Sequence, residues 1–120
     1  MKTEEVQSLV LRAPKGAAAA HLIADVPDGM GRAAACLLRD GLSPSFGVTG
    51  HADPCISIGF SFAGLEAMGV PESYLRLFRH LAPAFESGAV QRSVLLGDSG
   101  ASAAQKWQPA FRQDRAHVLL

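Results

Sequence analysis

The clearest alternation of large apolar and small residues lies in the segment Cys55–Phe62, which reads CISIGFSF. Isoleucine and phenylalanine occupy one set of alternate positions, while cysteine, serine and glycine occupy the other. This period of two predicts a β-strand whose apolar face packs on helices and whose small-residue face admits a partner sheet. Three other segments also favour strands. They are an edge strand or arm at Val6–Leu11, a first central strand at His21–Val26, and the start of a last strand at Ala116–Leu120.

Between these segments the apolar positions recur with the period of an α-helix. The first such stretch predicts a helix from Gly29 to Arg39, with Asp28 as its N-cap and Gly41 as a left-handed stop. Residues 42–54 and 96–106 are rich in glycine and serine and are expected to form loops. Three further helices are expected at Phe62–Met68, Glu72–Leu81 and Phe85–Leu95, with breaks at Gly69, Pro71 and Pro83.

The expected order of elements is strand, helix, strand, helical insertion and strand. This order matches the first part of a ferredoxin-like βαββαβ unit of the α+β class, with a helical insertion and without the last helix and strand. The 120 residues leave room for one domain, so we expect a single domain over residues 1–120, incomplete at the C-terminus and truncated in its third core strand. Losing three or four buried side chains, at about 1.5–3 kcal/mol each, would rival the whole stability of a domain. A marginal or partner-dependent chain is therefore expected.

Composition narrows the range of partners. Lysine plus arginine and aspartate plus glutamate both number 11, so the formal net charge is zero. Because there is no basic field, nucleic acid is not an expected partner, whereas a near-zero charge favours a homo-oligomer. The first residues lack the pattern of a signal peptide, and the apolar runs are shorter than the ~20 residues that span a bilayer. We expect a cytoplasmic protein without membrane contact, in which Cys36 and Cys55 are reduced, buried thiols.

Several motifs follow one another along the second half of the chain. Residues 60–72 read FSFAGLEAMGVPE, residues 85–100 read FESGAVQRSVLLGDSG, and residues 117–120 read HVLL after the lone Trp107. The series resembles the amino-terminal part of the dye-decolourising (DyP-type) haem peroxidases. That family shows F-x-x-x-GL-x-A-LG-x-P, then F-x-x-G-x-x-x-R-x-x-x-LGD, then a tryptophan and a strand beginning near VH-x-LL.

The sequence departs from the family pattern at a few positions. Met68 stands where leucine is usual, and Ala116 precedes His117 where valine is commoner. Residues 6–12, VQSLVLR, look like the family's opening VQG-x-VLR, with Ser8 in place of glycine. The resemblance therefore extends over nearly the whole chain.

The resemblance implies a two-part protein in which two ferredoxin-like halves pack together and the carboxy-terminal half holds most of the haem contacts. The family's distal GxxDG motif, proximal histidine and distal arginine have no counterpart among these residues, and Gly97-Asp98-Ser99-Gly100 is not that motif. We therefore assign no catalytic, haem-binding or metal residue, and expect no haem on this chain alone. A carboxy-terminal haem-binding half or a partner subunit is the expected partner.

Four residues stand out as structural candidates. His117 is expected to make a structural hydrogen bond at a strand entry, in preference to a catalytic role. For Arg92 and Asp98, an ion pair that fixes the loop Leu96–Gly100 is favoured over a catalytic pair. Trp107 is expected to pack between helices, in preference to carrying an electron from a surface dye. The spacing of the histidines does not fit a zinc site.

Three interpretations of function remain open at this point. The leading one is the amino-terminal portion of a DyP-type peroxidase, a family that oxidises dyes and other organic substrates with hydrogen peroxide, here inactive alone. The rival is a haem-free binding or assembly module that pairs with another chain through an open sheet edge. The third is a gene remnant without function.

Overall fold

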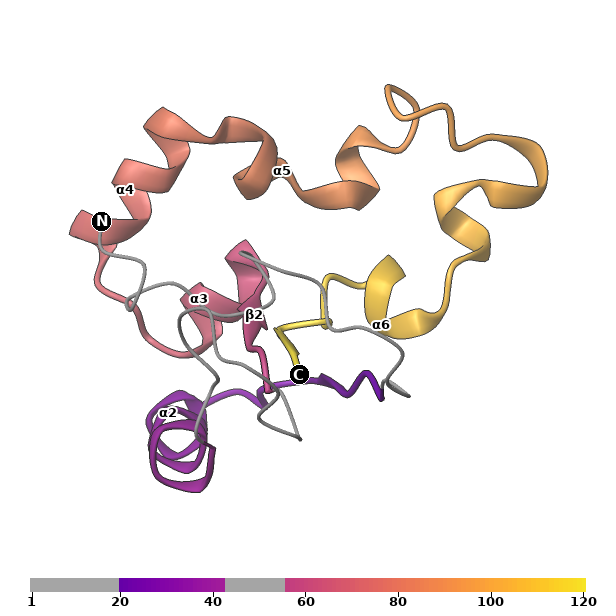
Figure 1. Ribbon diagram of the computed structural model, residues 1–120. Coiled ribbons are helices and arrows are strands. Elements are labelled where there is room, and N and C mark those ends of the chain that lie inside the picture. Colours follow the sequence, from indigo (N-terminus) through magenta and orange to yellow (C-terminus); the bar gives the residue numbers. More distant parts are fainter. Residues whose placement is uncertain (1–19, 43–55) are drawn as a thin grey trace, which may run out of the picture.

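A computed structural model describes residues 20–42 and 56–120 of the chain (Figure 1). The expected strand at Val6–Leu11, the loop at residues 43–54 and the residue Cys55 lie outside these ranges. The described part is an α+β structure of several short helices and a small antiparallel sheet. Within it, none of the helices combines the length and the apolar character needed to cross a membrane.

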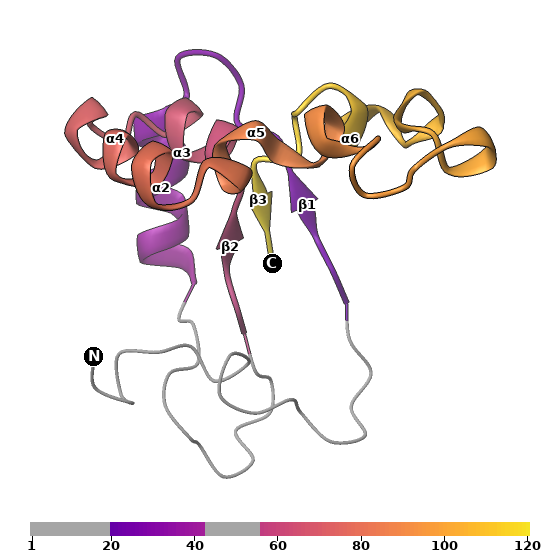
Figure 2. The same cartoon turned by 90° about the horizontal axis from the view of Figure 1, so that it is seen from above.

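The sheet has three strands, β1 (Ile23–Ala24), β2 (Gly59–Phe60) and β3 (Val118–Leu119). Their order is β1-β3-β2, and β3 runs antiparallel to both neighbours, between which it lies in Figure 2. Two backbone hydrogen bonds between Leu22 and Leu120, each 2.9 Å long, extend the pairing of β1 with β3. The strand that comes last in the sequence is thus the central one, and it joins two strands that are not hydrogen-bonded to each other.

The strand expected at Cys55–Phe62 is much shorter in the structure, where β2 covers only Gly59 and Phe60. The strand ends because Ser61 is the N-cap of helix α3 (Phe62–Ala67), and its hydroxyl accepts a hydrogen bond from the Gly64 N–H at 3.0 Å. Phe62 is buried as a helical residue instead of as the last residue of a strand. The cap therefore overrides the continuing alternation.

Helix α2 (Gly31–Gly41) begins and ends two residues later than expected. Gly29 has a φ of +78°, which places a turn between Asp28 and the helix, so the N-cap is Met30 and no side chain caps it. The prediction of Asp28 as N-cap was wrong for this reason. The prediction of a left-handed stop at Gly41 was also wrong, because Gly41 is helical and the chain leaves the helix through extended Leu42.

The helical insertion contains α3, α4 (Glu72–Leu81) and α5 (Pro83–Arg92), followed by the 3₁₀ turns η2 (Gly100–Ser102) and η3 (Ala104–Lys106) and by α6 (Pro109–Arg112). The bounds expected for α4 are confirmed, as is the break after α3, where Gly69 has a φ of +78°. The helix expected at Phe85–Leu95 starts earlier, with Pro83 in its first turn, and ends at Arg92. In Figure 1 the arc from α4 to α5 runs above the sheet, and α2 lies below it.

Few side chains in the described part are fully buried. The buried apolar residues are Val26, Phe62, Leu75, Ala104 and Val118. By contrast, many large apolar side chains remain exposed, including Leu81, Val94 and Leu95, each more than three-quarters exposed.

Two glycines allow backbones to pack directly on one another. A Cβ atom on Gly64 of α3 would lie 2.1 Å from the carbonyl oxygen of His117, at the entry to β3. A Cβ atom on Gly31 of α2 would lie 2.2 Å from the carbonyl oxygen of Ala67, at the end of α3. Both distances are shorter than any real contact of a methyl carbon. The stacking of α2 on α3, and of α3 on β3, therefore requires glycine at these two positions.

We predict that Gly64→Ala lowers the free energy of unfolding by about 1–3 kcal/mol, because the clashing atoms belong to the backbone of His117 and cannot swing away. The measurement is thermal or urea unfolding followed by circular dichroism. Gly59→Ala is the matched control, since its Cβ would meet only the Leu119 Cβ at an ordinary 3.9 Å. Equal stability of the two variants would contradict the packing described here.

Candidate functional site

An open apolar cleft of about 910 Å³ separates the sheet from α5 and α6. Its apolar lining includes side chains from all three strands and from the helical insertion, among them Ile23, Phe60, Phe85, Val90, Phe111 and Val118. The polar lining includes His21, Glu66, Glu86, Arg92 and Asp114. A concave, mostly apolar surface with a few polar groups is the usual form of a binding surface.

Aromatic rings in edge-on and tilted contact support the wall of the cleft that belongs to the insertion. The ring of Phe85 on α5 lies edge-on to Phe62 of α3, with 5.9 Å between the ring centroids, and 5.5 Å from Phe78 of α4. Aromatic pairs at such distances add about 0.5–1.5 kcal/mol to the gain from burial. Phe85 thus holds three helices together while one of its sides faces the cleft.

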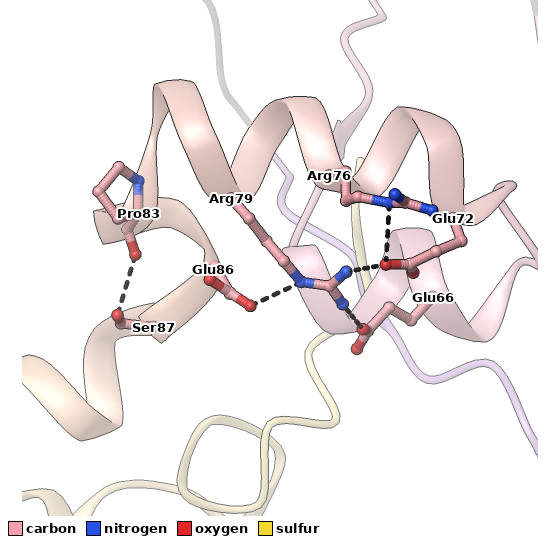
Figure 3. A network of polar contacts seen from close by, with 7 residues as sticks. All are labelled: Glu66, Glu72, Arg76, Arg79, Pro83, Glu86 and Ser87. Carbon is pink, nitrogen blue, oxygen red and sulfur yellow. Dashed lines mark hydrogen bonds and ion pairs between the residues drawn. The ribbon is translucent and has the colours of Figure 1, made fainter.

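A polar cluster beside these rings is centred on Arg79 of α4, which binds carboxylates from three helices (Figure 3). Its guanidinium donates to Glu86 of α5 at 2.7 Å, to Glu66 of α3 at 3.2 Å, and to Glu72 of its own helix. The guanidinium carbon also lies 5.3 Å from the centre of the Phe62 ring. The hydrogen bond to Glu86, reinforced by the charge of Glu72, raises the pKa of Arg79. We call this group the Arg79 clamp.

A break in α5 shapes the next part of the cleft wall. Gly88 has φ 67° and ψ 176°, a conformation that in practice only glycine adopts. The Ser87 hydroxyl donates to the Pro83 carbonyl at 2.9 Å and closes the turn before the break (Figure 3). The helix therefore changes direction at Gly88 and brings Val90 and Arg92 to the cleft.

The structure does not join Arg92 to Asp98. Arg92 lines the cleft, and among the described residues neither side chain forms an ion pair with the other. The expected ion pair was therefore wrong. Backbone hydrogen bonds hold the turn instead, with Asp98 N–H donating to Ser93 O at 2.8 Å and Gly97 N–H donating to Val94 O at 3.1 Å.

Trp107 also lines the cleft, so two of the four candidates from the sequence, Arg92 and Trp107, come to the same surface. The indole N–H of Trp107 donates to the carbonyl of Ser102 at 2.7 Å, which anchors the ring to the 3₁₀ turns before α6. Trp107 follows η3 (Ala104–Lys106) and precedes α6 in the sequence, and the residue is only partly exposed.

His117, the fourth candidate, lies away from the cleft, where β3 begins. Its Nδ1 accepts a hydrogen bond from the Val26 N–H at 2.9 Å, and its side chain is 12% exposed. Its backbone N–H donates to Ala24 O at 3.0 Å, and its carbonyl accepts from Ser61 N–H at 3.1 Å. His117 thus contacts β1 and the residue that follows β2, and we call this group of contacts the His117 junction.

Comparison with known families decides where this arrangement belongs. Residues 50–120 match the DyP dimeric alpha+beta barrel domain. This chain belongs to the DyP family. The match covers β2, the whole insertion, the cleft residues that the insertion provides, and β3. No curated protein and no solved structure matches the chain.

DyP-type proteins generally hold haem, and the described residues of this DyP chain do not fit a haem centre. Haem iron takes histidine, cysteine, methionine or tyrosine as its axial ligand. The cleft lining contains one such residue, His21, which is exposed and precedes β1 instead of lying in a strand as expected. Across residues 20–42 and 56–120, no three His, Cys, Asp or Glu residues are grouped so as to hold a metal ion.

Sequence reasoning missed the Arg79 clamp of this DyP domain. Part of it was visible, because Glu72, Arg76 and Arg79 recur along α4 at helical spacing. Glu66 and Glu86 come from the neighbouring helices, and no pattern along the chain indicates that they converge on the same guanidinium. The sequence also showed no sign of the break at Gly88, because a continuous helix was predicted over Phe85–Leu95.

We predict that Arg79→Gln lowers the melting temperature at low ionic strength, because three carboxylates lose their shared cation. The deficit should shrink in about 1 M salt, where charges are screened within about 3 Å. Differential scanning fluorimetry at both salt concentrations measures the effect. Arg76→Gln is the matched control, since Arg76 only approaches Glu72, at 3.9 Å. A deficit of the same size for both variants would contradict the clamp.

Proposed function

We propose that this chain is the amino-terminal, structural part of a DyP-type haem peroxidase and has no peroxidase activity by itself. The intact protein would oxidise dyes and other organic substrates with hydrogen peroxide through haem held by a carboxy-terminal half. The observation that carries the proposal is the match of residues 50–120 to the DyP domain, together with a cleft whose lining offers one exposed imidazole.

The sheet supports the finer proposal that residues 1–120 form one ferredoxin-like domain. In a βαββαβ unit, the third strand lies between the first two and is antiparallel to both. The order β1-β3-β2 has this arrangement, with α2 connecting β1 to β2. The segment from α3 to α6 then corresponds to a helical insertion between the second and third strands.

The cleft supports a role as a wall for the haem-binding half. Phe60, Phe111 and Leu119 contribute apolar surface to it, and Phe111 and Leu119 are more than 40% exposed. Such surface gains about 25 cal/mol per Å² when another layer covers it. The contact proposed here places the apolar face of the sheet against the haem-binding half and leaves haem ligation to that half.

We predict that titrating the purified chain with ferric haem gives no stoichiometric Soret band and no peroxide-dependent dye oxidation. His21 is the lone imidazole of the cleft lining, so any weak absorbance from adventitious ligation there should disappear in His21→Ala and persist in His80→Ala. The matched control His80 is an exposed histidine on α4. Tight one-to-one haem binding with turnover would overturn the proposal.

A second candidate is a haem-free assembly module that pairs with another chain through a sheet edge. It is favoured by the topology, since β1 and β2 are the outer strands of the sheet that the described residues form, and β1 is exposed. A homo-oligomer is the form of this candidate that the zero net charge supports. Light scattering on the same preparation separates the two, because a stable, well-folded monomer would count against the assembly module.

A further inference from the structure

The imidazole of His117 meets two groups at the same nitrogen atom. Nδ1 accepts the Val26 N–H at 2.9 Å, and the Asp25 carboxylate oxygen Oδ1 lies 3.2 Å from that same Nδ1. Asp25 and Val26 are consecutive residues that follow β1, and His117 precedes β3. A backbone donor and a carboxylate acceptor therefore compete for one ring nitrogen.

These two contacts exclude each other. An imidazole nitrogen without a proton accepts a hydrogen bond, and a protonated one can only donate. With the lone pair on Nδ1, the ring binds the Val26 N–H, and the Asp25 oxygen Oδ1 receives no hydrogen bond from the ring. With a proton on Nδ1, the ring binds Asp25 and the Val26 N–H loses its acceptor. One proton therefore selects which partner is held.

The surroundings keep the carboxylate in place for this exchange. The guanidinium of Arg115 binds the other carboxylate oxygen of Asp25, Oδ2, with Nε at 2.7 Å. That contact raises the pKa of Arg115, an effect to which the charge of Asp28 also contributes. The charged groups near the ring are thus Asp25, which follows β1, and Arg115, which precedes β3. Helix α3 contributes the backbone of Gly64 there.

We propose that His117 is a proton-operated latch between the end of β1 and the start of β3. Above the transition the ring holds the Val26 amide; below it, the ring donates to Asp25 and releases that amide. Val26 is 4% exposed, so its released N–H has little access to water and the segment leading to α2 loosens. The latch is independent of haem and of any peroxidase activity.

The test follows the Val26 amide by NMR in the ¹⁵N-labelled full chain between about pH 8 and pH 5, the range in which histidine changes charge. We expect its hydrogen-exchange protection, corrected for the intrinsic rate, to fall by about two- to tenfold, as for the loss of one hydrogen bond. In His117→Gln, whose amide oxygen can still accept, protection should stay constant over this range.

The matched control is His80→Gln, which removes an exposed histidine of α4 and should leave the transition unchanged. Constant protection of the Val26 amide in the parent chain would overturn the proposal. So would a transition that persists in His117→Gln, since another group would then be responsible.

Discussion

The close approach of α3 to the start of β3 is the contact on which the other elements depend. Gly64 lies directly on the His117 carbonyl, and no larger residue fits between them. At the same place the backbone of His117 bonds to Ala24 of β1 and to Ser61, the residue between β2 and α3. Because β1 and β2 are not hydrogen-bonded to each other, this junction joins two separate strands and a helix into one sheet with a helix packed on it.

The helical insertion is held by a different kind of interaction. The aromatic ring of Phe85 and the guanidinium of Arg79 together tie α3, α4 and α5 into an arc above the sheet. Since α3 is also part of the His117 junction, the arc is attached to the sheet through α3. The arc does not close onto the sheet, and the apolar cleft lies between them. That opening is the surface which a peroxidase domain of this family would present to its haem-binding half in the function proposed above.

Local signals predicted helices well and long-range contacts poorly. The bounds of α4 followed from Pro71 and the helical period, which act within a few residues. The strand predicted at Cys55–Phe62 is longer than the observed β2, because the alternation of residues continues past Ser61, where helix α3 is capped. An Arg92–Asp98 ion pair was expected, but in the structure Arg92 lines the cleft, and backbone hydrogen bonds hold the turn at Asp98.

The family resemblance supplied the assignment that local patterns could not, and the match over residues 50–120 bears it out. It gave no indication of why Gly64 and His117 should both be needed. Their contact joins residues 53 positions apart, so the packing demand appears only in three dimensions.

Native-state hydrogen exchange tests the central role of the His117 junction most directly. If the junction organises the structure, the amides of Ser61 and His117 should be the slowest to exchange and should open together, with the free energy of global unfolding. The amides of α4 should open earlier, because most of that helix is exposed. Junction amides that exchange faster than those of α4 would contradict the account.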